Sequence, residues 1–142
     1  MKSTDRLQYL RAALVVIGII FVVAIYPLMI FWSSGWAWQP HQSEYERMII
    51  GVYATLGVFL LLAARSPLKH LSLIWFTVWS SLIHGGIMAF QAVIDPAERG
   101  HLLGDIPALL IVAVILAAFT PRGTDVETAS DVNANYSSPE VS

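Results

Sequence analysis

Four long stretches without a charged side chain constrain this chain more than any other feature. Residues 12–43, 48–64, 71–94 and 106–120 contain no Lys, Arg, Asp or Glu. A helix needs roughly 20 mostly apolar residues to cross the hydrocarbon core of a bilayer. Within each stretch the apolar residues are continuous and do not alternate with polar ones, which favours helices over the strands of a membrane barrel. The sequence therefore predicts four membrane-spanning helices, at about residues 10–31, 44–64, 70–93 and 102–119.

The composition agrees with a membrane protein and excludes several other classes. Charged residues make up 13% of the chain, whereas a soluble domain averages about 25%. The net charge of −2 argues against nucleic acid as a partner. The absence of cysteine excludes disulfides, thiolate metal ligands and cysteine nucleophiles. We expect one transmembrane domain, residues 1–122, and a disordered cytoplasmic tail, residues 123–142, whose Ser, Asn, Asp and Glu residues have little to bury.

The distribution of positive charge predicts how the chain lies in the membrane. Four spans place both termini on one side. Because cytoplasmic segments are enriched in Lys and Arg, we predict an all-α, antiparallel four-helix transmembrane bundle in the inner (cell) membrane, with both termini cytoplasmic. Six basic residues fall on the side of the termini and two on the other side: Lys2, Arg6, Arg11, Arg65, Lys69 and Arg122 against Arg47 and Arg99. Trp32, Trp36 and Trp38 lie where the first span leaves the bilayer, as an aromatic belt does.

A polar stripe runs along the third predicted helix. A polar stripe on a membrane helix faces the bundle interior or water, because lipid offers it no hydrogen bonds. His84 lies ~15 Å below the outer end of this helix at 1.5 Å per residue, which is near mid-membrane. The small residues Gly85 and Gly86 would let another helix approach closely beside it. Steps of three and four residues place these side chains on the stripe: Thr77, Ser81, His84, Met88, Gln91 and Asp95.

The second predicted helix carries charge in its first turns. Ser43 and Glu46 have the spacing of a capping box, so this helix is expected to begin at Ser43. Arg47 lies one turn inside the helix and needs a carboxylate partner. Glu44, Glu98 or Asp105 would supply one.

The start of the fourth helix leaves two alternatives open. Asp105 followed by Pro107 has the pattern of a helix start, with a capping residue and then a proline in the first turn. A helix from Asp105 to Thr120 spans only about 23 Å, short of a ~30 Å hydrocarbon core. Either residues 100–105 enter the membrane in non-helical form, or a longer helix begins at Glu98 and is kinked at Pro107. In both alternatives Asp105 lies just below the outer surface and points inward.

These residues together predict a polar cup that opens to the outside. A buried His84 that hydrogen-bonds Ser or Thr neighbours is the structural alternative, and the outer charged residues would then be solvated loop residues with one Arg–carboxylate pair between helices. The cup has His84 as its floor, Gln91 and Asp95 as its lining, and Arg47, Glu98, His101 and Asp105 as its rim.

No metal site is predicted. A metal site would combine His84, His101 or His41 with a carboxylate, but the chain has no HxxxH or HExxH spacing. A bis-histidine haem would need a second deep histidine opposite His84. The identity of any cofactor is left open by the sequence.

Three function classes remain open, and the first is preferred. The protein is a non-enzymatic binder of a small ligand or ion or an accessory subunit, a proton-coupled transporter or channel component, or a membrane enzyme acting on a lipid-like or quinone-like substrate. Polar residues are few in the cytoplasmic half, which favours a cup over a through-channel. The expected partners are the lipid bilayer and either a second copy of the chain or a larger membrane complex.

Four segments of the sequence carry a resemblance to a known family. They are YPLM (26–29), GVYATLGVFLLLAAR (51–65), SLIWFTVWSSLIHGGIM (72–88) and GHLLGDIPALL (100–110). On these segments, residues from about 5 to 122 resemble a family of small bacterial four-helix integral membrane proteins of unknown function. The resemblance implies no activity. It does imply that the family pattern includes His84, Gly85, His101, Gly104, Asp105 and Pro107.

Overall fold

The structure is a computed structural model that describes residues 3–38 and 43–121, without the side chains of Ser3 and Ser43. Regular structure within these ranges is entirely helical. The predicted tail at 123–142, His41 and the capping side chain of Ser43 lie outside the described residues.

Four apolar helical segments are long enough to cross a membrane, as the sequence predicts. They cover Thr4–Phe31, Glu44–Ala63, Pro67–Ile94 and Pro96–Phe119. The first comprises α1 (Ser3–Ile19), the π-helical η1 (Ile20–Ala24) and α2 (Ile25–Phe31), and it is followed by the short α3 (Ser33–Trp36). The second is α4 (Ser43–Ala63), the third joins the 3₁₀ turn η2 (Pro67–His70) to α5 (Leu71–Ile94), and the fourth joins the 3₁₀ helix η3 (Pro96–Leu103) to α6 (Asp105–Phe119).

Pro27 gives the first span its irregular middle. Proline has no N–H, so residue 27 cannot donate the α-helical hydrogen bond to the carbonyl of Val23, and its ring crowds that carbonyl. Val23 belongs to η1, where the wider π turn makes room for the ring. The interruption leaves Phe21 and Ile25 buried on the inner side of this span.

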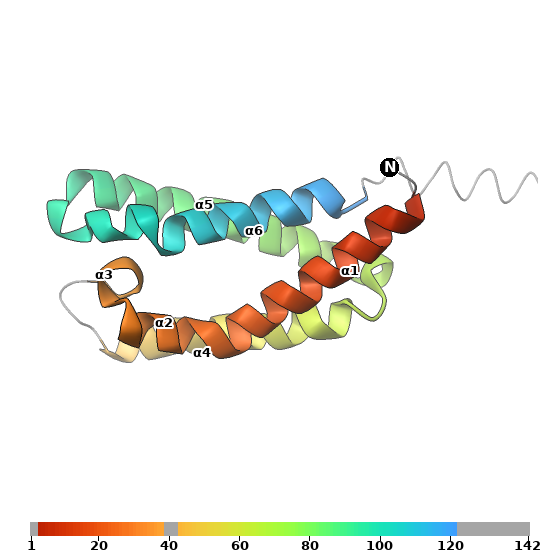
Figure 1. The fold of residues 1–142 in the computed structure, drawn as a ribbon, viewed down its shortest axis with the longest axis horizontal. Helices are drawn as coiled ribbons and strands as arrows, with labels where there is room; N and C mark the ends of the chain where they lie inside the picture. Colours follow the sequence, from red (N-terminus) through yellow and green to blue (C-terminus); the bar gives the residue numbers. More distant parts are fainter. Residues whose placement is uncertain (1–2, 39–42, 122–142) are drawn as a thin grey trace, which may run out of the picture.

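The helices form two pairs that meet at both ends (Figure 1). The α1–η1 segment packs along α4, and α5 packs along α6. At the end that holds η2, α1 also contacts α6, and at the opposite end α3 packs on η3. We call these two regions the η2 end and the α3–η3 end.

Glycines allow a close approach between α1 and α4, and not beside His84. A Cβ atom built on Gly57 would lie 2.7 Å from the carbonyl oxygen of Gly18, so neither position accepts a side chain without movement of the backbone. Gly85 makes only an ordinary contact, 3.5 Å from Cβ of Leu109, and Gly86 has nothing within 4 Å. The predicted close approach at Gly86 is therefore wrong. Gly86 lies on an exposed face of α5, where no other helix reaches it.

An apolar core fills the η2 end of the bundle. Arg6 closes this end by donating from Nη2 to the backbone oxygen of Thr120 at 2.9 Å. The fully buried side chains of the core come from α1, α4, α5 and α6: Leu10, Leu14, Leu60, Ile74 and Leu116. The α3–η3 half is built differently, and it holds the candidate site.

Candidate functional site

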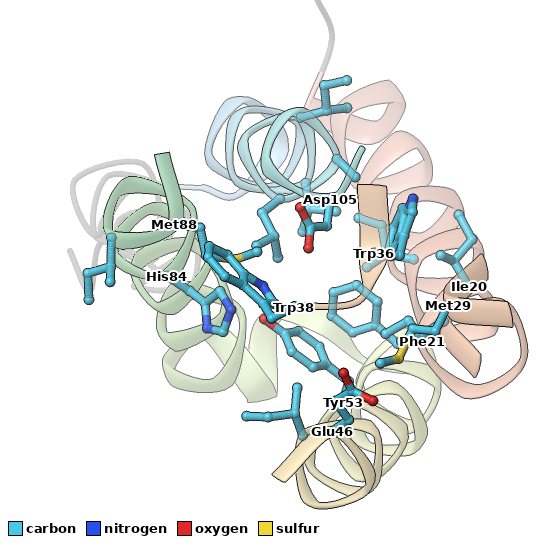
Figure 2. A pocket seen from close by; sticks show the side chains of 18 of the residues that line it. Ile20, Phe21, Met29, Trp36, Trp38, Glu46, Tyr53, His84, Met88 and Asp105 are labelled. Carbon is cyan, nitrogen blue, oxygen red and sulfur yellow. The ribbon is translucent and has the colours of Figure 1, made fainter. Parts of the chain in front are cut away.

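A cavity of about 940 Å³ lies between the two helix pairs in the α3–η3 half of the bundle (Figure 2). Pockets of 300–1,000 Å³ are the size that takes small molecules, and they are mostly apolar with a few placed polar groups. The wall of this cavity fits that description. Its polar side chains, apart from its tyrosines and tryptophans, are Glu46, His84, Gln91 and Asp105, and its apolar side chains include Ile17, Phe21, Ile25, Met29, Ile87, Met88, Leu109 and Val112.

Three rings from three elements form one continuous contact across the cavity. Tyr53 of α4 meets Phe21 of η1 edge to face, with ring centroids 5.0 Å apart and an interplanar angle of 84°. On its other side Tyr53 meets His84 of α5 with a centroid distance of 5.9 Å and an angle of 81°. Edge-to-face pairs orient the rings as well as burying them. The two ring contacts therefore fix the orientation of Tyr53 and of the half-buried His84 imidazole, which both line the cavity.

A second group of titratable side chains is buried where η3 meets α6. Nδ1 of His101 lies 2.9 Å from Oδ2 and 3.0 Å from Oδ1 of Asp105. Nε2 of the same ring lies 3.2 Å from Oε2 of Glu98, although the described residues offer this nitrogen no hydrogen bond of good geometry. Exposure is 0% for His101, 3% for Glu98 and 9% for Asp105. One buried imidazole thus lies between two mostly buried carboxylates.

Trp38 covers this group from the α3 side. Its ring stacks on that of His101, with centroids 4.3 Å apart and planes inclined by 18°. The stack depends on a very close approach of two backbones. A Cβ atom on Gly100 would collide with the carbonyl of Ser34, and one on Gly104 would collide with the carbonyl of Gly35. Glycine at both positions of the GHLLG segment therefore brings α3 down onto η3.

A smaller pocket of about 300 Å³ lies beside the main cavity, and the two share Trp38 and Gln91. Asp95 and Glu98 line this smaller pocket. The carboxylate of Asp95 accepts a hydrogen bond from the backbone nitrogen of Ala97 at 2.9 Å, so it caps the start of η3.

The structure distributes the residues of the predicted cup over three places. His84, Gln91 and Asp105 line the main cavity, and Asp95 and Glu98 line the smaller pocket. His101 lies beneath Trp38, between Glu98 and Asp105. Arg47 is exposed on α4 and lines neither pocket. Two of its predicted carboxylate partners, Glu98 and Asp105, contact His101.

The predicted helix start at Asp105 is confirmed, because α6 begins there. The segment before it is neither non-helical nor part of a helix kinked at Pro107, since residues 96–103 form the 3₁₀ helix η3. Gly104 occupies the N-cap position, so the Asp105 side chain is not the cap and contacts His101. A 3₁₀ helix rises about 2.0 Å per residue, and η3 carries the chain well below Pro96. A Cβ atom on Gly85 would lie 3.8 Å from the backbone oxygen of Ile106. Asp105 therefore lies near the level of His84, deeper than predicted.

Sequence reasoning missed the aromatic part of the site. Trp36 and Trp38 have the positions of an aromatic belt, yet both line the cavity. Tyr53 and Glu46 line it as well, although neither belongs to the predicted cup. The spacing of Gly100 and Gly104 permits a close backbone approach to η3, but only the structure shows that the partner is the segment around Gly35.

Comparison with known families gives one match. The family described as a family of unknown function (DUF6632) matches residues 4–136. Neither the curated proteins nor the solved structures give a match. Since the match spans nearly the whole chain, including both helix pairs and the cavity between them, this small protein with four apolar, membrane-length helices belongs to DUF6632.

Proposed function

We propose that this protein is a non-enzymatic binder, which holds an amphipathic small molecule from the bilayer in the cavity around Tyr53, His84 and Asp105. One observation carries the proposal. In one half of the bundle a partly open cavity of about 940 Å³ is lined by mostly apolar side chains with a few polar groups among them. Interiors normally pack without such voids. A cavity of this size and lining is typical of a ligand site.

The surroundings of the cavity support entry from the membrane. Several lining residues are also exposed on the outside of the bundle, so the cavity wall continues into the apolar surface that faces lipid. Val16 of α1 is 56% exposed, Ile87 of α5 is 55% exposed and Ile111 of α6 is 57% exposed. These three residues come from both helix pairs, since α1 belongs to one pair and α5 and α6 form the other. An amphipathic molecule would enter there without crossing a polar surface.

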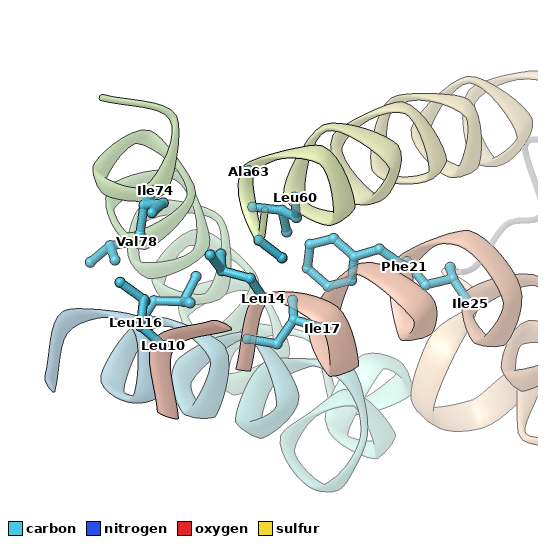
Figure 3. Packing of buried hydrophobic residues seen from close by; sticks show 12 residues of the cluster. Leu10, Leu14, Ile17, Phe21, Ile25, Leu60, Ala63, Ile74, Val78 and Leu116 are labelled. Atoms are coloured by element: carbon cyan, nitrogen blue, oxygen red, sulfur yellow. The ribbon is translucent and has the colours of Figure 1, made fainter. Parts of the chain in front are cut away.

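The packed η2 end supports binding over passage through the protein. Leu10, Leu14, Leu60 and Ile74 fill the space between the helices at that end with no exposed area (Figure 3). A solute or ion that moved on from the cavity would have to displace this core. The cavity therefore has the form of a cup with a closed base.

We further propose that the bundle is antiparallel and lies in a bacterial inner membrane with both termini in the cytoplasm. The excess of Lys and Arg near the termini and the η2 turn supports this orientation. The α3–η3 end, with the smaller pocket, would then face outward.

A pair of alanines on α6 offers a test of the binding site. Ala108 lines the cavity, whereas Ala118 is exposed on the outside of the same helix. The Ala108→Trp variant fills the cavity, and the Ala118→Trp variant adds the same group where only lipid is displaced. Native mass spectrometry of protein released from detergent records amphiphiles that copurify from the host membrane. We expect a bound mass on wild type and Ala118→Trp but not on Ala108→Trp. Equal binding by all three proteins would contradict the proposal.

A further inference from the structure

The charged groups on the cavity wall all have the same sign. Glu46 and Asp105 line the cavity, and no Lys or Arg is found among its lining residues in the part of the chain that the structure describes. The smaller pocket has the same character, with Asp95 and Glu98 in its wall. A ligand that carries a positive charge would be attracted to such a wall, and one that carries a negative charge would be repelled.

The imidazole of His101 cannot compensate both of the carboxylates beside it. Two carboxylates, those of Glu98 and Asp105, flank the single imidazole of His101, which can compensate at most one negative charge. Nδ1 of His101 is a single donor shared by both oxygens of Asp105. A carboxylate has about four acceptor sites, so Asp105 retains acceptors for a ligand. Figure 2 shows its carboxylate directed toward the middle of the cavity.

Aromatic rings surround the same space. Trp36, Trp38, Phe21 and Tyr53 all border the cavity around Asp105 (Figure 2). The face of an aromatic ring attracts an organic cation, most strongly in Trp.

We infer that the cavity takes a lipophilic organic cation, an amine or quaternary ammonium compound with an apolar chain. The ammonium group contacts Asp105 and the rings of Trp36 and Trp38, and the chain lies along the apolar side chains toward Phe21 and Ile25. This inference rests on the proposed function and specifies its ligand class. The smaller pocket adds Asp95 and Glu98 on the far side of Trp38, which extends the acidic surface toward the α3–η3 end.

The test compares three ligands of equal chain length on the wild-type protein. Radiolabelled decyltrimethylammonium, decanol and decanoate are titrated onto the protein in nanodiscs of zwitterionic lipid, and partition into the lipid is subtracted with the Ala108→Trp variant. We expect saturable binding in which decyltrimethylammonium is held about tenfold or more tightly than decanol, because a charge-assisted contact is added to the same apolar burial. Decanoate should bind more weakly than decanol.

A variant then assigns the preference to one carboxylate. Asp105→Asn keeps an oxygen acceptor beside His101 but removes the charge, so it should reduce the cation's advantage over decanol to about twofold while decanol binding stays unchanged. His70→Asn, at an exposed position on η2, is the matched control and should retain the full preference.

The outcomes separate this inference from the proposed function. Equal binding of decyltrimethylammonium and decanol by wild type would overturn the cation preference and leave the binding cavity standing. Binding of all three ligands no greater than to Ala108→Trp would overturn the binding function itself. The comparison of ligands uses wild type, so the conclusion does not depend on whether Asp105→Asn folds.

Discussion

The ring of Trp38 lies flat against the ring of His101, with centroids 4.3 Å apart and only 18° between the two planes. Trp38 follows α3, and His101 belongs to η3, so one contact joins the two separate helix pairs at the α3–η3 end. It also places Trp38 between the main cavity and the smaller pocket. The same contact therefore closes the fold and shapes the candidate site.

Removing the Trp38 ring should weaken this end of the bundle. We expect Trp38→Ala to lower the free energy of unfolding by about 2 kcal/mol, less than for a fully buried tryptophan because Trp38 is half-buried. Unfolding in mixed micelles, followed by circular dichroism, measures the change. Trp79→Ala is the control, since Trp79 is 61% exposed on α5. An equal loss in both variants would show that the stack with His101 adds no stability.

Two glycine substitutions should change stability in opposite directions. Gly104→Ala puts a methyl group against the backbone oxygen of Gly35, so we expect a loss of about 2 kcal/mol in unfolding free energy. Gly86→Ala adds a methyl group inside α5 where nothing lies within 4 Å, so we expect a gain of about 0.5–1 kcal/mol from better helix propensity. Thermal unfolding of the two purified variants measures both. Stabilisation by Gly104→Ala would contradict the close contact between α3 and η3.

The buried pair of His101 and Asp105 should show strong energetic coupling. His101→Phe keeps a ring beneath Trp38 but removes both nitrogens, and we expect it to cost about 3 kcal/mol because buried carboxylates lose a shared partner. A double-mutant cycle with Asp105→Asn should give a coupling energy of about 1–3 kcal/mol. The parallel cycle of His70→Phe with Asp105→Asn should give a value near zero, because His70 is exposed at the other end of the bundle. Additive effects in the first cycle would mean that the imidazole and the carboxylate act independently.

Solvent access to His84 can be measured with cysteine, because the chain has none of its own. The His84→Cys variant should react with a small neutral thiol reagent, since His84 borders the cavity. Ile83 is 60% exposed on the apolar outside of α5. A cysteine at this position would face lipid, where the reactive thiolate does not form, so Ile83→Cys should react much more slowly. The rates of thiol modification of the two variants are measured by mass spectrometry of the adduct, with the protein in nanodiscs. A dry, unreactive position 84 would exclude a water-accessible cavity.

Labelling from outside the cell tests the proposed orientation. Ser33 lies at the α3–η3 end and Lys69 lies at the η2 end, and both are exposed. With a membrane-impermeant maleimide on intact cells, Ser33→Cys should be labelled and Lys69→Cys should be labelled only after lysis. The reverse pattern would place the termini outside.

Much of the fold follows from local sequence. Long charge-free segments have to bury their backbone polar groups in helices when they lie in lipid, so the four spans could be located from residue type alone. Pro67 and Pro96 mark the starts of the third and fourth spans, because proline is accepted at the beginning of a helix. The polar stripe also identified the face of α5 on which His84, Met88 and Gln91 border the cavity.

The site itself was decided by contacts between residues far apart in the chain. The position of Asp105 depends on η3 adopting a 3₁₀ helix, and its partner His101 is fixed by a tryptophan more than 60 residues earlier in the sequence. No periodicity within one helix reports such a contact. The close approaches of Gly57 to Gly18 and of Gly104 to Gly35 are equally invisible locally, because a glycine shows its role only against the backbone that packs on it. The sequence by itself determined which four segments are long and apolar enough to cross a membrane and which face of α5 is polar. Tertiary structure alone decided that one half of the bundle has a continuous apolar core and the other half has a cavity between the helix pairs, because that depends on how α3 and η3 space the two pairs.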